Sequence, residues 1–90
     1  MLRIWGKLIK DNKIIKDKVI ELVIKDTYQE ALKEAVTEIC KEMDVAKPYW
    51  LNHNLEEYNN RNKTSFDENN FIEEIDFDKF EIEELEVEKR

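Results

Sequence analysis

The sequence predicts an α+β domain: an N-terminal antiparallel β-hairpin packed on one long amphipathic helix, a short helical or loop crossover, and a C-terminal edge strand. Three observations support this fold. Two β-prone runs flank an Asp-Asn pair near the start, apolar residues recur every three or four positions from 27 to 43, and another β-prone run begins at residue 79. Ninety residues suit one domain with one small core, so we expect a single domain over residues 1–90.

The two β-prone runs predict a hairpin over residues 2–24. Asp11 and Asn12 suit a two-residue turn, because Asn tolerates a positive φ. The register that follows places Ile9 opposite Ile14, Lys7 opposite Lys16, Trp5 opposite Lys18, and Arg3 opposite Ile20. The expected core face then carries Leu2, Ile4, Leu8, Ile15, Val19 and Val23. A bulge near Ile20-Glu21 would return Leu22 and Ile24 to that face, since one extra residue flips every side chain after it.

The main helix is expected over residues 27–43. Thr27 and Glu30 form a capping box at its start. Spacings of three and four continue for over four turns, which is typical of a helix that buries one face. The apolar positions are Tyr28, Ala31, Leu32, Ala35, Val36, Ile39, Cys40 and Met43. The run is too short for an independent coiled coil, so we expect the helix to cover the sheet.

The crossover is expected over residues 48–75. Pro48 takes the preceding residue out of helical geometry, and an aromatic knot, Tyr49-Trp50-Leu51, follows it. Two further N-caps are predicted, at Asn54 (with Glu57) for a short helix to about Arg61, and at Ser65 (with Glu68) for another turn. The last strand is expected over residues 79–87, with Phe80 and Ile82 on one side and Leu85 and Val87 on the other. Glu83 and Glu84 in its centre fit an edge position.

Several short segments carry a resemblance. They are Trp5-Gly6-Lys7 ahead of a Lys-Asp-Asn-Lys hairpin, Tyr49-Trp50-Leu51, Thr64-Ser65-Phe66, Phe71-Ile72-Glu73 and Asp76-Phe77-Asp78. Together they resemble a group of short uncharacterised bacterial proteins, mainly from Firmicutes, over nearly the whole chain. The resemblance implies a small standalone bacterial domain. It implies no activity and no site.

Charge is sorted along the chain. Residues 1–26 hold seven Lys or Arg against four Asp or Glu, and residues 67–90 hold three against eleven. The net charge of −7 therefore belongs largely to the C-terminal part. We expect the N-terminal lysines to find counterions among the C-terminal glutamates, which disfavours polyanions and anionic membranes as partners.

Composition argues against most chemistry. One glycine leaves no backbone loop for phosphates, so no nucleotide cofactor is expected. Cys40 and His53 are the only residues of their kinds, so neither a cysteine–histidine metal site nor a complete nucleophilic set is expected. Asp76, Asp78 and Glu81 match no calcium-loop spacing. No leader or apolar membrane span is evident. We expect a cytoplasmic protein that is not an enzyme, with no catalytic, cofactor or metal site.

Two surfaces are candidates for binding. Trp5 among Arg3, Lys7, Lys16 and Lys18 would suit a nucleic-acid stacking platform. Alternatively, this is a solvated face, or its lysines pair across strands with Glu81, Glu83, Glu84 and Glu86. Tyr49 and Trp50 are either core filler or an interface, since Trp and Tyr are enriched in binding hot spots.

The expected function is a non-catalytic protein-interaction or regulatory module. A protein partner or self-association, through a sheet edge or the aromatic knot, is favoured over a nucleic acid, a membrane or a small-molecule substrate. One alternative is a nucleic-acid-associated accessory protein that uses the Lys/Trp hairpin face. The other is an acidic polyanion mimic that uses the tail from Lys79 to Arg90.

Overall fold

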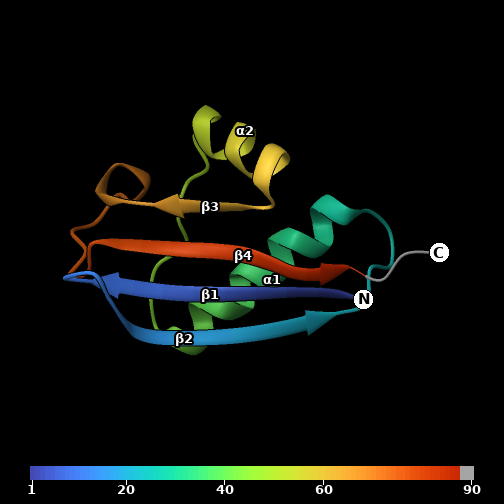
Figure 1. The fold of residues 1–90 in the computed structure, drawn as a ribbon, viewed down its shortest axis with the longest axis horizontal. Helices are drawn as coiled ribbons and strands as arrows, with labels where there is room; N and C mark the ends of the chain where they lie inside the picture. Colours follow the sequence, from blue (N-terminus) through green and yellow to red (C-terminus); the bar gives the residue numbers. More distant parts are fainter. Residues whose placement is uncertain (88–90) are drawn as a thin grey trace.

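The computed structural model describes residues 1–87, without the side chains of residues 86 and 87. The fold is α+β, with a four-stranded antiparallel sheet and two helices (Figure 1). The elements in chain order are β1 (Leu2–Lys10), β2 (Lys13–Leu22), α1 (Tyr28–Met43), α2 (Asn52–Arg61), β3 (Lys63–Phe66), a 3₁₀ turn (Glu68–Asn70) and β4 (Lys79–Val87). The strand order is β2-β1-β4-β3. Among the described residues, no helix is long and apolar enough to cross a membrane.

The hairpin turn is confirmed, but the register beyond it is not. Asp11 and Asn12 both have positive φ, 54° and 66°, and Ile9 pairs with Ile14 as expected. The ladder then shifts between Leu8 and Ile9, so that Lys7 lies opposite Asp17. The bulge therefore sits beside the turn and not near residue 20.

This early bulge exchanges the faces of β2. Leu2, Ile4 and Leu8 of β1 are buried in the core, as expected. The expectation for Ile15, Val19 and Val23 is wrong, because all three are exposed. Ile20, Leu22 and Ile24 pack against the core in their place. The bulge beside the turn brings all three to the buried face, without the predicted bulge near Ile20-Glu21.

Helix α1 covers the core face of β1 and β2 (Figure 1). Thr27 accepts a hydrogen bond from the backbone N–H of Glu30 at 3.1 Å, so the predicted cap is confirmed. The helix comes very close to β1 at Gly6. A Cβ at this position would lie 2.6 Å from Cγ2 of Ile39 and 3.1 Å from Cε1 of Phe80. Glycine is needed here for the close approach of the helix.

The last strand has the predicted bounds, but the expectation that it is an edge strand is wrong. Strand β4 lies between β1 and β3. The sequence does not predict the outer neighbour, β3, because Lys63 ends a polar, loop-like stretch and Ser65 has the spacing of a helical cap with Glu68. Ser65 lies within this strand, and Asp67 caps the 3₁₀ turn in its place. Residues 88–90, the end of the predicted acidic tail, lie outside the described residues.

Helix α2 begins two residues before the predicted cap, and Asn54 has another role. The Asn54 side chain is fully buried inside the first turn. Its Oδ1 accepts from the Leu51 N–H and from Asn70 Nδ2, and its Nδ2 donates to Thr64 Oγ1 and to the Ser65 carbonyl. These four bonds of 2.8–3.0 Å use the full capacity of the amide. They join α2 to β3 and to the 3₁₀ turn.

We predict that Gly6→Ala destabilises the protein by about 1–3 kcal/mol, the usual cost of overpacking a core. The added methyl collides with the branched side chain of Ile39, whose χ1 is restricted within a helix. Urea unfolding followed by circular dichroism measures the change. In an Ile39→Ala background the same substitution should cost less, because its main obstacle is gone. Equal costs in the two backgrounds would contradict the close contact.

We predict that Asn54→Ala costs about 2–4 kcal/mol, because buried polar groups of Asn70, Thr64 and Ser65 each lose one hydrogen-bond partner. The matched control is Asn60→Ala, an exposed position on the same helix, which should change stability by under about 0.5 kcal/mol. Thermal and urea unfolding of both variants provide the comparison. A loss no larger than the control's would refute the role assigned to the network.

Candidate functional site

The open face of the sheet, opposite α1, holds Trp5 and Lys7. Lys7 is only 7% exposed, and its Nζ lies 3.4 Å from an oxygen of Glu81 and 3.2 Å from one of Glu83. The same amino group lies 4.0 Å from the centre of the Trp5 ring. The Trp5 indole N–H donates to Asp17 at 2.9 Å. Lys7 therefore has its counterions, Glu81 and Glu83, in the C-terminal strand.

Lys16 and Lys18 lie on the other face of the sheet. Lys16 donates to the Met43 carbonyl at 3.4 Å, and Lys18 lies 3.9 Å from Glu42. Both contacts are at the C-terminal end of α1, where cations are favoured by the helix dipole. The early bulge thus separates the two lysines from Trp5 and Lys7, and the predicted Lys/Trp hairpin face is not brought together.

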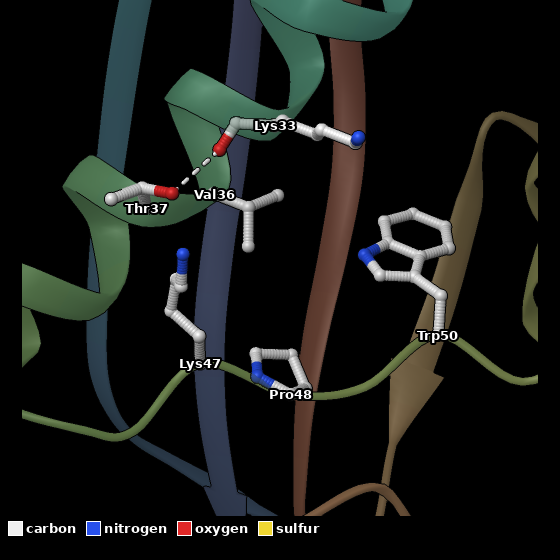
Figure 2. A pocket seen from close by; sticks show the side chains of 6 residues that line it. All are labelled: Lys33, Val36, Thr37, Lys47, Pro48 and Trp50. Carbon is white, nitrogen blue, oxygen red and sulfur yellow. Dashed lines mark hydrogen bonds between the residues drawn. The ribbon is translucent and has the colours of Figure 1, made fainter.

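A hollow of about 270 Å³ lies between α1 and the chain that leads into α2 (Figure 2). We call it the basic hollow. Three residues of α1 and three of the crossover line it: Lys33, Val36, Thr37, Lys47, Pro48 and Trp50. In Figure 2 the Trp50 indole nitrogen faces the hollow, and Val36 and Pro48 supply apolar wall. The site combines positive charge with apolar surface.

The polar groups available in the basic hollow are donors. The Thr37 hydroxyl is already used, because it donates to the Lys33 carbonyl at 2.8 Å. Among the side chains that the structure describes, none forms an ion pair with Lys33 or Lys47, and none bonds to the Trp50 N–H. Two ammonium groups and one indole N–H suit a carboxylate or another anion.

Core packing holds Trp50 in position. Its ring meets Tyr58 edge-on with centroids 5.8 Å apart, and meets Phe66 edge-on at 5.1 Å. One side of the indole is therefore anchored in the core while its nitrogen faces outward. Tyr49, the other aromatic candidate, is exposed. The sequence singled out Trp50 but missed both lysines of the hollow, because nothing local relates Lys33 to Lys47. The one available signal was that Lys47 precedes a proline and an aromatic pair.

A second group of titratable side chains joins α1, α2 and β4. The Tyr28 hydroxyl donates to Glu84 and lies 2.8 Å from the Tyr58 hydroxyl. Burial, followed by the hydrogen bond to Glu84, raises the pKa of Tyr28 well above its ordinary value. Burial raises the pKa of Tyr58 to about 12. Both phenols stay protonated at neutral pH and act as structural donors.

The remaining candidates for chemistry stay apart. Cys40 is buried on α1, and burial raises the pKa of its thiol to about 11 despite the lowering effect of Lys47. His53 is exposed at the start of α2. Among the described residues, no three His, Cys, Asp or Glu side chains are placed to hold a metal ion.

We predict that stability falls as the pH rises above about 9. Cys40 and both tyrosines have raised pKa values in the folded state, so the unfolded chain loses protons first. Their contribution is intact below the unfolded pKa values of 9.0 and 10.0 and declines above them, by up to roughly 1 kcal/mol per pH unit and group. Urea unfolding at pH 8, 10 and 11 tests this. Tyr28→Phe should flatten the decline above pH 10, and a flat profile in the parent protein would refute the prediction.

No family model, curated protein sequence or solved structure matches this chain.

Proposed function

We propose that this protein is a non-catalytic protein-binding module whose basic hollow takes an acidic, partly apolar segment of a partner protein. One observation supports the proposal above the others. Lys33 and Lys47 border an apolar, Trp-lined hollow without a counterion inside the described chain, although the protein as a whole carries a charge of −7. The two lysines would attract a negatively charged ligand locally, although the protein as a whole is negative.

The size of the basic hollow favours a protein segment over a free small molecule. Sites for small molecules are usually deep clefts of about 300–1,000 Å³ that bury most of the ligand. At about 270 Å³, the hollow can take one side chain with its neighbours. Exposed Tyr49, Leu51 and Leu55 follow the same segment and extend the apolar surface available to a partner. Trp50 provides the kind of anchored aromatic contact found at interface hot spots.

The two alternatives draw less support from the contacts. A nucleic-acid platform would need Trp5 and Lys7 free, but Asp17, Glu81 and Glu83 occupy them. An acidic mimic built on β4 would need its glutamates free, yet Glu81 and Glu83 are committed to Lys7. Both remain distinguishable by experiment, because neither requires the basic hollow.

We predict that Lys33→Glu/Lys47→Glu lowers affinity for a Glu-Glu-Phe-Glu-Glu peptide by about 10–100-fold, as two partly exposed attractions become repulsions. Trp50 fluorescence in a Trp5→Phe background reports binding. Lys10→Glu/Lys13→Glu is the matched control, because it makes the same charge change at exposed positions of the hairpin.

The control variant and a Glu-Glu-Ala-Glu-Glu peptide define the contrary outcomes. If both double variants lost affinity equally, the effect would come from net charge and not from the basic hollow. Equal binding of the phenylalanine and alanine peptides would show that the apolar wall of the hollow contributes nothing to affinity. Failure of the parent protein to bind the phenylalanine peptide at millimolar concentration would refute the proposal.

A further inference from the structure

We infer that the segment bound by the basic hollow comes from a second copy of this chain, which inserts Ile72 together with Glu73 and Glu74. This inference rests on the proposed function and names the partner. Ile72 is 81% exposed, the highest value among the large apolar side chains that the structure describes as exposed. Two exposed carboxylates follow it directly. This short segment, Ile72–Glu74, is apolar and acidic, and it therefore complements the apolar and basic lining of the hollow.

The exposure of Ile72 follows from how the loop is held. Phe71 and Phe77 are buried and meet edge-on, with ring centroids 5.8 Å apart. The loop between them is thereby closed at its base by an aromatic pair. Ile72 is directed to solvent although both anchors reach the core. Ile72 therefore stands clear of the core and is available for contact with a partner.

Two hydrogen bonds tie the base of the segment to the part of the chain that lines the basic hollow. The Tyr49 N–H donates to the Asn70 carbonyl at 2.7 Å, and Asn70 Nδ2 donates to the Tyr49 carbonyl at 2.6 Å. Tyr49 stands between Pro48 and Trp50, which line the hollow, and Asn70 stands two residues before Ile72. Two copies related by a twofold axis could therefore fill each other's hollow, which is the usual form of a closed homodimer.

Other routes to self-association are less favourable. The outer edge of the sheet at β2 carries Lys16 and Lys18 on one face, and edge lysines discourage pairing between copies. At the other edge, Asn54 already bonds to the Ser65 carbonyl of β3. Charge in the basic hollow favours association, since Lys33 and Lys47 attract the glutamates after Ile72. Opposite charge therefore favours this contact over either sheet edge.

Sedimentation velocity of the full chain from 10 to 500 µM at 0.15 M salt tests the inference. We expect a concentration-dependent monomer–dimer equilibrium. Ile72→Ser should weaken it at least tenfold, because the inserted side chain is lost. Thermal unfolding of the dilute monomer should be unchanged, because the position is exposed. Val23→Ser, at another exposed apolar position, is the matched control and should leave the equilibrium unaltered.

A charge exchange makes the test specific. Lys33→Glu/Lys47→Glu and Glu73→Lys/Glu74→Lys should each be monomeric alone, because each places like charges at both contacts. Mixed in equal amounts, the two variants should form a heterodimer, since opposite charges then meet in both hollows. A heterodimer would be decisive support, and failure of the mixture to associate would overturn the inference.

Other results separate this inference from the proposal beneath it. A parent protein that stays monomeric at 500 µM, but whose Trp50 fluorescence still reports the Glu-Glu-Phe-Glu-Glu peptide, overturns the homodimer and leaves the binding module standing. A monomer that also fails to bind that peptide overturns both. A dimer that resists Ile72→Ser and both charge variants uses another surface and also overturns the inference.

Discussion

The close approach of α1 to β1 at Gly6 determines the layout of the whole buried face. With no side chain at this position, Ile39 and Phe80 fill the space above the strand. The helix therefore lies low over β1 and β2, and only its first turn reaches β4, where Tyr28 bonds to Glu84. The rest of the half formed by β4 and β3 is covered by side chains of the crossover and α2, including Trp50 and Tyr58. The basic hollow lies where these two coverings meet.

Local chemistry was readable from the sequence where a residue's own neighbours decide its conformation. The Asp11-Asn12 turn, the Thr27 cap and the bounds of β4 depend on such short-range preferences. The site of the bulge does not, because residues 14 and 15 are both isoleucine and either alignment satisfies the turn. Only packing beneath α1 selects the register, and a slip of one residue reverses which side of β2 is buried.

Long-range pairing accounts for the other errors. Strand β3 is four residues long and forms because β4 has a free edge beside it and Asn54 satisfies its outer carbonyl at Ser65. No periodicity in so short a segment signals a strand. The same limit applies to the basic hollow, whose lysines are far apart in sequence. Of the residues that line the hollow, the sequence indicates only Trp50, because tryptophan is enriched at binding hot spots.

Some lysines find counterions within the chain and others do not, and this difference explains where binding is proposed. Lys7 is nearly buried, so leaving it unpaired would cost far more than leaving an exposed lysine unpaired. Glu81 and Glu83 meet that need on the open face. Lys33 and Lys47 border an open hollow, where water can solvate them without a partner. Folding therefore fixes the counterions of the first lysine and leaves the other two available.

Rigidity then gives the available lysines a fixed frame. Asn54 and Asn70 bond to each other and tie α2, β3 and the Tyr49 backbone into one network. Segments on both sides of Tyr49 are thus held before any partner arrives. A surface ordered in advance loses less conformational entropy on association, so modest contacts can suffice. Weakening this network would loosen the wall of the basic hollow and the base of the Ile72 loop together, which couples stability to binding through the same buried amides.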